Sequence, residues 1–162
     1  MRNSEAAVIA VTHDPEEAMI MGDRIALMRD GQIVQVGTNE EMIFNPIDKY
    51  TVNTFSNVNA YKSKVDAKKV MTPVGEFDVS NLKEGDNVEV LIRDVAFNII
   101  NATEKNSYIV KQIDFTGEKS RILLTPNDSN DIIKIVIPGK SQIKPDDKIG
   151  LSVDNRYVHV FN

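Results

Sequence analysis

The sequence predicts an α+β protein in two parts, a helix-and-strand segment over residues 1–60 and a small β-barrel over residues 61–162. In the first part, apolar runs alternate with helix-start patterns, whereas the second part holds short β-rich runs separated by turn residues. The balance of charged residues also changes along the chain, near residue 50. Residues 1–50 hold four Lys and Arg against nine Asp and Glu, and residues 51–162 hold 15 of each.

Composition narrows the functional class. The 162 residues suffice for one domain, or for a small domain plus part of another. The net charge of -5 argues against nucleic acid as a partner. The chain has no cysteine, so disulfides and thiolate chemistry are excluded. No apolar run approaches the roughly 20 residues that span a bilayer, and the start lacks a signal-peptide layout. We therefore expect a cytoplasmic chain.

Three strands are expected in the first part. Residues 8–11 are apolar and β-branched, which is typical of a strand buried in a parallel sheet. Residues 25–29 and 32–37 flank Asp30-Gly31 and predict a hairpin. Because a hairpin cannot cover both faces of a buried strand, we expect the chain to open inside an α/β domain whose earlier part is absent.

Helices are expected between and after these strands. Asp14 is a good N-cap before Pro15, Glu17 completes a capping-box spacing, and Gly22 is a stop.

A second helix is expected from Thr38, with Glu41 three residues on. It is interrupted at Asn45-Pro46, and Pro46 is expected to begin a third helix toward Phe55.

The second part is expected to consist of short strands at close spacing, which suggests a small closed barrel. The predicted strands cover residues 87–93, 107–115, 120–125, 132–137, 148–153 and 157–161.

Two stretches carry a family resemblance. The run "VIAVTHDPEEAMIMGDRIALMRDGQIVQVGTNEEMIFNP" closely resembles the C-terminal end of an ABC-transporter ATPase domain, in which a strand ends in Thr-His-Asp before a helix carrying Glu-Glu-Ala. The runs "KVMTPVGEFDVSNLKEGDNVEVLIR" and "IPGKSQIKPDDKIGLSVDNRYVHVF" resemble the TOBE domain, a small OB-like barrel of importer ATPases. The family commonly reads Leu-Ile-Arg-Pro-Glu-Asp-Val, whereas residues 91–95 here read Leu-Ile-Arg-Asp-Val.

The resemblance implies that residues 1–60 are the end of a P-loop ATPase domain and that His13 is its switch histidine, which reaches the γ-phosphate of ATP. A side chain at the end of a parallel strand points into the crevice where α/β proteins bind ligands, and imidazole can donate a hydrogen bond to phosphate. Asp14 is interpreted as a cap.

The chain lacks the remaining ATPase machinery. A P-loop reads Gly, four residues, Gly-Lys-Ser/Thr. "PGKS" (138–141) has Lys134 where the first Gly is required, and "TGEKS" (116–120) has the wrong spacing. No signature motif and no Mg²⁺-binding Asp-Glu precedes His13. The resemblance implies ATP and Mg²⁺ as cofactors of a full-length ATPase, but for this chain alone we expect no hydrolysis.

Two interpretations of the barrel stay open. It could contact a second ATPase subunit, or it could bind a small oxyanion through backbone N–H groups and polar side chains. The candidate residues for the second interpretation are Thr116, Lys119, Ser120, Lys140 and Ser141.

The other candidate residues, which are glutamates, methionines and a histidine, have structural interpretations. Glu16, Glu17, Glu40 and Glu41 lie in first helical turns, where carboxylates favour the helix dipole. The methionines at 19, 21, 28 and 42 are expected to be apolar filler. His159 alternates with Val158 and Val160 and is expected on a solvent-facing side of a strand.

We therefore expect the C-terminal regulatory and dimerisation part of an importer ATP-binding subunit, of the ferric iron, polyamine, sulfate or molybdate, phosphonate or sugar type. Its implied partners are a second subunit, permease subunits that hold it at the inner membrane face, and, indirectly, a substrate-binding protein. Alternatives are a free-standing oxyanion-binding barrel and a natural short product that competes for the permease. Self-association through residues 1–60 is also expected, because an unpaired strand invites pairing.

Overall fold

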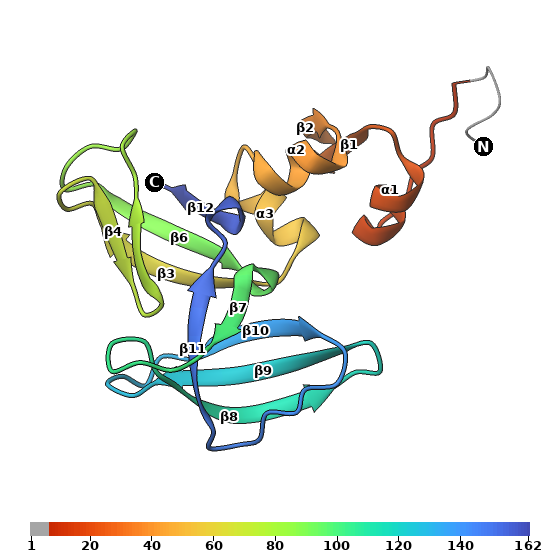
Figure 1. Ribbon diagram of the computed structural model, residues 1–162. Helices are drawn as coiled ribbons and strands as arrows, with labels where there is room; N and C mark the ends of the chain where they lie inside the picture. Colours follow the sequence, from red (N-terminus) through yellow and green to blue (C-terminus); the bar gives the residue numbers. More distant parts are fainter. Residues whose placement is uncertain (1–6) are drawn as a thin grey trace.

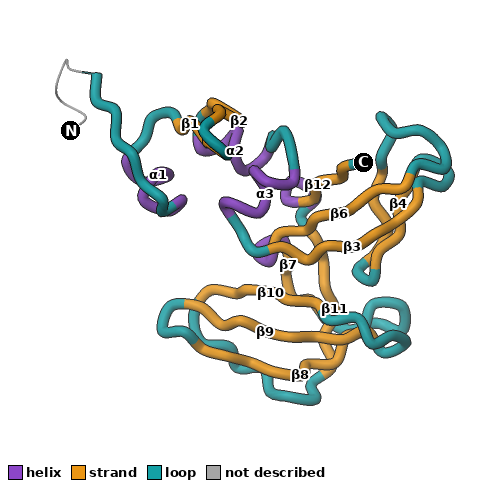
Figure 2. Tube along the Cα trace, turned by 180° about the vertical axis from the view of Figure 1, so that it is seen from behind, coloured by secondary structure: helices purple, strands orange, loops and turns teal. Residues whose placement is uncertain are grey.

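The computed structural model describes residues 7–162 and consists mostly of strands with few helices (Figure 1). The N-terminal elements lie to one side of the sheets, with α1 farthest from them in both views (Figures 1 and 2). These elements are α1 (Pro15–Met21), β1 (Ile25–Arg29), β2 (Gln32–Gly37), α2 (Asn39–Phe44) and α3 (Lys49–Phe55).

Local signals in the sequence account for the first helix and the hairpin. Asp14 caps α1 by accepting hydrogen bonds from the backbone N–H groups of Glu16 and Glu17. Asp30 and Gly31 adopt positive φ angles of 52° and 77°, as the tight β1–β2 turn requires.

The second helix also begins as predicted. The Thr38 side chain accepts a hydrogen bond from the Glu41 N–H, and the Glu41 carboxylate accepts one from the Thr38 N–H. This complete capping box confirms the predicted start of α2.

Three predictions in this segment are wrong. Residues 8–11 form no strand, and Ile9 and Val11 are 94% and 96% exposed, because no neighbouring strand pairs with them. The third helix begins at Lys49 with Asp48 as its cap, not at Pro46. The Glu17 carboxylate accepts a hydrogen bond from Thr12 Oγ1 (2.7 Å) and does not complete a capping box.

All six strands predicted after residue 60 are present, with ends within one residue. They are β6 (Asn87–Arg93), β8 (Tyr108–Phe115), β9 (Lys119–Pro126), β10 (Ile133–Pro138), β11 (Lys148–Val153) and β12 (Val158–Phe161). The prediction missed β3 (Val58–Lys64), β4 (Lys69–Thr72), β5 (Gly75–Asp78) and β7 (Phe97–Ile100), and two short 3₁₀ turns, η1 (Asp94–Ala96) and η2 (Asn155–Tyr157).

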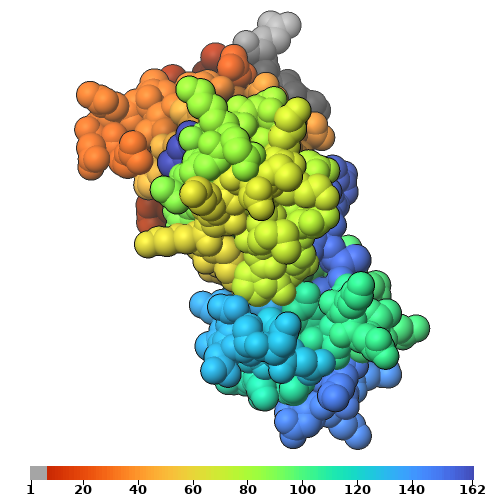
Figure 3. All heavy atoms as spheres, turned by 90° about the vertical axis from the view of Figure 1, so that its left-hand side faces the viewer, coloured from red at the N-terminus to blue at the C-terminus, as the bar shows by residue number. Residues whose placement is uncertain are grey.

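The strands do not form one closed barrel. Their order is β10-β9-β8-β11-β7 in one sheet and β12-β6-β3 in another, and β1-β2 and β4-β5 are separate hairpins. The prediction of a mostly β part is confirmed and that of a closed barrel is not, because β7 and β10 remain edge strands. Figure 3 shows the β3–β6 half above the β8–β10 half.

The main core lies between the sheets. It includes Val90 and Ile92 of β6, Val110 of β8, Ile122 of β9 and Ile135 of β10, each no more than 1% exposed. Strand β3, which crosses the predicted boundary at residue 60, pairs with β6 along its whole length. The helical segment is therefore followed directly by a strand of the β part.

Gly150 of β11 is required where this strand passes β7. A Cβ at this position lies 2.6 Å from the backbone oxygen of Asn101 and 3.0 Å from Ile100 Cγ1. We expect Gly150→Ala to lower the free energy of unfolding by about 1–3 kcal/mol, the usual cost of overpacking. Ser152→Ala, on an exposed position of the same strand, is the control and stays within about 0.5 kcal/mol of the original in urea denaturation.

Candidate functional site

Arg93, at the end of β6, joins the helices to the sheets. Its side chain is fully buried. Nη1 donates to the backbone oxygen of Val52 (3.2 Å) and to Ser56 Oγ (2.5 Å), and Nη2 donates to the backbone oxygens of Ile43 (3.2 Å) and Met42 (3.5 Å). These acceptors lie in the last turns of α2 and α3 or just beyond, where carbonyl groups lack partners within the helix. One guanidinium therefore fixes both helix ends to β6.

The charge of Arg93 is not balanced by an ion pair within the described residues. Burial lowers its pKa to about 10, and the nearby Tyr157 and Asp94 act in the opposite direction. Arg93 is therefore still cationic at neutral pH, and its partners are carbonyl dipoles of two helix C-termini, which favour a cation.

His159 lies on the same side of the sheet as Arg93. It pairs with Leu91 across β12 and β6, and its side chain is 9% exposed. The prediction that it faces solvent is wrong, because α2 and α3 cover this side. Burial, followed by the charge of Arg93, lowers the pKa of His159 to about 4, while the Ile43 carbonyl acts in the opposite direction. His159 is therefore neutral at pH 7.

The candidate oxyanion residues come together at one end of the five-stranded sheet. Ser120 is fully buried, and its hydroxyl donates to the Gly139 oxygen (2.8 Å) and accepts from the Ser141 N–H (2.9 Å). Thr116 Oγ1 donates to the Lys119 oxygen (3.1 Å). These polar groups tie two turns together, which leaves Lys119 and Lys140 as the exposed cationic side chains of the cluster.

A shallow groove of about 440 Å³ lies beside this cluster, between the edge strands β7 and β10. Its lining is mainly apolar and includes one cation. The lining residues are Val95, Phe97, Asn98, Ile99, Glu118, Lys119, Val136, Ile137 and Pro138.

Asp94 is a buried carboxyl group of η1, and Lys119 and Arg121 of β9 lie near enough to act on it. Burial raises its pKa, while a hydrogen bond with the Asn57 side chain and the two cations oppose this rise. Asp94 follows Arg93 directly, where the family motif has Pro-Glu. Here its backbone N–H donates to the Asn57 oxygen (3.0 Å), so this loop is held by the α3–β3 connection.

His13 lies in the exposed stretch immediately before α1. Its neighbours are fixed, because the Asp14 N–H donates to Thr12 Oγ1 (3.0 Å) and Thr12 Oγ1 donates to Glu17. The structure does not bring His13 together with the candidate oxyanion residues, which lie in the β part (Figure 1).

The predicted structural roles of other residues are partly confirmed. Met42 is fully buried, whereas Met21 and Met28 are more than half exposed.

In the part of the chain that the structure describes, no group of three or more His, Cys, Asp or Glu side chains could hold a metal ion. Over the same residues, no helix has the length and apolar character that crossing a membrane requires.

Comparisons with known proteins find relatives of this sequence. No protein-family model matches the sequence. The glycine betaine transport ATP-binding protein OpuAA of Bacillus subtilis is 44% identical over 43% of this chain and 15% of its own length. The Fe(3+) ions import ATP-binding protein FbpC of Streptomyces avermitilis is 27% identical over 91% of this chain and 43% of its own. The spermidine/putrescine import ATP-binding protein PotA of Photobacterium profundum is 34% identical over 63% and 30%.

This chain is homologous to the ATP-binding subunits of ABC importers. It corresponds to a C-terminal portion of such a subunit and spans less than half the length of these three relatives. Among solved structures, the molybdate-bound form of the cytoplasmic molybdate-binding protein ModG matches 63% of this chain and 94% of its own, with a TM-score of 0.50 and 12% identity. That likeness supports the OB-like fold of the β part.

The role of Arg93 was not predicted from the sequence. The residue appeared only as part of a motif. Arginine is mostly exposed in proteins, so the stretch "VEVLIR" carries no local sign that Arg93 is buried.

We expect Arg93→Met to destabilise the protein, because the helix-end carbonyls lose a charged donor. A hydrogen bond to a charged group is worth about 1.5–3 kcal/mol, so a loss of at least about 2 kcal/mol is expected in urea denaturation. Arg156→Met is the matched control, since Arg156 pairs with Asp154 at the surface. Equal stability of the two variants would contradict the role of Arg93.

His159 makes stability depend on pH. Its pKa is lower in the folded protein than in the unfolded chain, so its contribution is complete above about pH 6.5 and is lost as the pH falls toward about 4. His159→Gln should flatten this part of the stability curve, as measured by urea unfolding between pH 7.5 and 4.5. Identical slopes for both proteins would rule out this effect.

Proposed function

We propose that this chain acts as the C-terminal part of the ATP-binding subunit of an ABC importer, where it joins the end of the nucleotide-binding domain to a TOBE-type barrel. The extent of the match carries the proposal, since FbpC of Streptomyces avermitilis aligns with 91% of the chain, across both the helical segment and the sheets. Arg93 supports it further, because it fixes the two regions to each other.

In such a subunit, we assign His13 the role of switch histidine toward the γ-phosphate of ATP. Its exposure and its place before the Asp14 cap suit this role, because the imidazole is free to meet a ligand held elsewhere. A homodimer, permease subunits at the inner membrane face and a substrate-binding protein are the implied partners. The names of relatives suggest ferric iron or a polyamine as the cargo class.

The residues present do not fit ATP on their own. The "PGKS" stretch starts at the last residue of β10 and leads through an irregular connection to β11. The "TGEKS" stretch covers the β8–β9 turn and the first two residues of β9. Neither opens a helix, so neither offers the backbone cradle of a P-loop. We derive no catalytic step within this chain.

A chimera tests the proposed function. The C-terminal part of the PotA relative is replaced by this chain, and ATP hydrolysis is measured. We expect an active chimera and a loss of about 10²-fold or more for its His13→Ala variant, a typical effect for a group that assists proton transfer or orients the reacting water. A folded chimera without activity would refute the proposal. The chain alone should hydrolyse no ATP.

A second candidate function is the binding of a small oxyanion at the Lys119 and Lys140 cluster. The convergence of the two turns and the shared fold of molybdate-binding ModG favour it. Isothermal titration with molybdate, tungstate and sulfate tests it, with the Lys119→Ala, Lys140→Ala double variant as control. We expect no binding if the barrel serves as a contact surface. Binding of one anion that the double variant loses would establish the effector site.

A further inference from the structure

Glu17 of α1 is bonded to both chain neighbours of His13. Its carboxylate accepts a hydrogen bond from Thr12 Oγ1 (2.7 Å), and its backbone N–H donates to Asp14 Oδ1 (3.3 Å). Thr12 Oγ1 in turn accepts a hydrogen bond from the Asp14 N–H (3.0 Å). We call these three hydrogen bonds among Thr12, Asp14 and Glu17 the His13 brace.

The His13 brace stands in place of the capping box predicted from the sequence. In a capping box, the carboxylate at the third helical position accepts directly from the N–H of the cap residue. Here the Thr12 hydroxyl lies between the two groups, because it accepts from the Asp14 N–H and donates to Glu17. Such a bond from a hydroxyl to a carboxylate is charge-assisted and short. Glu17 therefore acts on the residue before His13 as well as on the cap.

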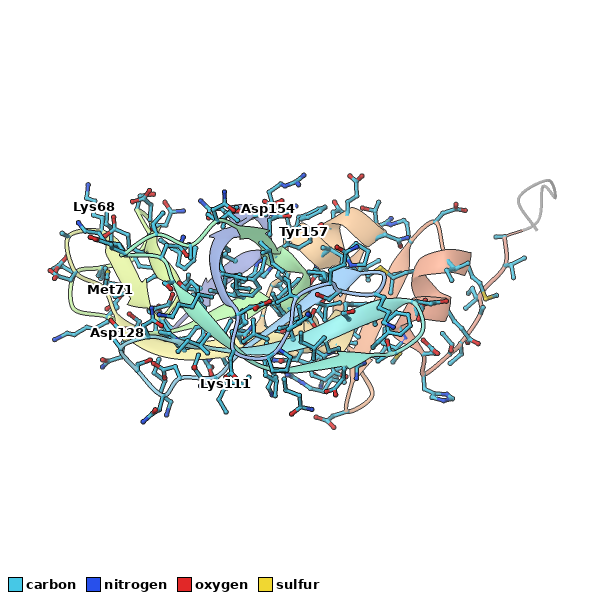
Figure 4. The ribbon with its side chains drawn as sticks, turned by 60° about the horizontal axis from the view of Figure 1, so that its bottom comes forward. Lys68, Met71, Lys111, Asp128, Asp154 and Tyr157 are labelled. Carbon is cyan, nitrogen blue, oxygen red and sulfur yellow. The ribbon has the colours of Figure 1, made fainter. Side chains whose placement is uncertain are left out.

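The His13 side chain takes no part in the His13 brace. The chain bends at His13, which is exposed, and none of the described residues forms a hydrogen bond with its imidazole. Helix α1 lies at the opposite end of the molecule from Lys68 and Met71 of the β part (Figure 4). The brace thus holds the backbone on both sides of the imidazole without help from the sheets and leaves the ring nitrogens available to a ligand.

We propose that Glu17 is a positioning residue for His13. This inference rests on the proposed function, in which the His13 imidazole meets the γ-phosphate of ATP. A misplacement of about 1 Å in a reacting geometry can lower a rate about 10²-fold, and a side chain on a loop is held less precisely than one on a helix. Glu17 reduces this freedom, because it ties the residue before His13 to the first turn of α1.

ATP hydrolysis by the chimera with PotA tests the positioning role. We expect Glu17→Ala to lower kcat about five- to twentyfold and to change the KM for ATP less than about twofold, because the position of His13 matters in the transition state. Glu16→Ala is the matched control. Glu16 carries the same charge in the same helical turn, and its carboxylate forms no hydrogen bond among the described residues. Equal losses in the two variants would assign the effect to the helix dipole and overturn the proposal.

Conservative substitutions separate the hydrogen bond from the charge. Glu17→Gln keeps an oxygen acceptor and Thr12→Ser keeps the hydroxyl, so each should lower kcat no more than about threefold. Thr12→Val removes the hydroxyl and should lower kcat at least as much as Glu17→Ala. Because Thr12→Val and Glu17→Ala remove the same bond, the double variant should be no slower than the slower single variant. Additive losses would contradict a shared link.

Amide hydrogen exchange, measured by NMR on the chain itself, provides a test that is independent of catalysis. Thr12 Oγ1 protects the Asp14 N–H, and Glu17 holds this hydroxyl in place. Glu17→Ala should therefore raise the exchange rate at Asp14 about three- to tenfold, whereas Glu16→Ala should not. The urea midpoint should stay the same in both variants, since these residues are exposed. An unchanged exchange rate in Glu17→Ala overturns the proposal.

The two assays distinguish failure of the inference from failure of the proposed function. A chimera that His13→Ala inactivates and Glu17→Ala leaves unchanged overturns the positioning role alone. A chimera whose rate is unaffected by His13→Ala overturns the proposed function, and the exchange rates at Asp14 then decide whether Glu17 orders the turn around His13.

Discussion

The burial of Arg93 is the constraint on which the rest of the structure depends. Moving a cation out of water is costly unless polar groups replace the lost hydration. Here the replacement comes from backbone carbonyls in the last turns of α2 and α3 and from Ser56 Oγ, not from a carboxylate. Carbonyls at a helix C-terminus lack N–H donors within the helix and carry the negative end of the helix dipole. The guanidinium therefore supplies donors to the carbonyls, and the carbonyls replace its lost hydration. Both occur only when α2, α3 and β6 are held in one arrangement.

This arrangement explains why residues 90–93 of β6 are buried on both faces. Val88, Val90 and Ile92 point into the main core, while Leu91 and Arg93 point to the helices. The alternation of polar and apolar residues over 87–90 is therefore lost over 90–93, which are all buried. The neighbouring strand β12 is affected as well. His159, opposite Leu91, becomes a buried neutral imidazole beside a cation. The helical segment and the sheets are thus joined through one strand, with β3 leading directly from the helices into the same sheet.

Much of the fold could be predicted from the sequence because its signals are local. The Asp14 cap, the Thr38–Glu41 capping box and the Asp30-Gly31 turn depend on residues a few positions apart. The errors concern features set by distant parts of the chain. Residues 8–11 have strand-like composition but no partner strand, and His159 faces helices more than 100 residues earlier. The missed hairpin of β4 and β5 has strands of four residues, too short for a clear pattern. Of the candidate site residues, Ser120 and Ser141 are in contact and Thr116 bonds the Lys119 oxygen, and these polar groups serve to join turns.

The two parts of the chain differ in how they bury apolar surface. The sheets enclose a continuous core to which β6, β8, β9, β10 and β11 all contribute. Residues 7–47, by contrast, hold nine of the fourteen large hydrophobic side chains that are exposed in the described chain, and α1 has no buried residue. A seven-residue helix is marginal in water without tertiary packing, whatever its caps contribute. Local interactions therefore define the shape of this segment, while its stability requires cover from another surface. Arg93 holds the one end of the segment that is already packed, which leaves the β1–β2 hairpin and α1 as the elements where such cover can act.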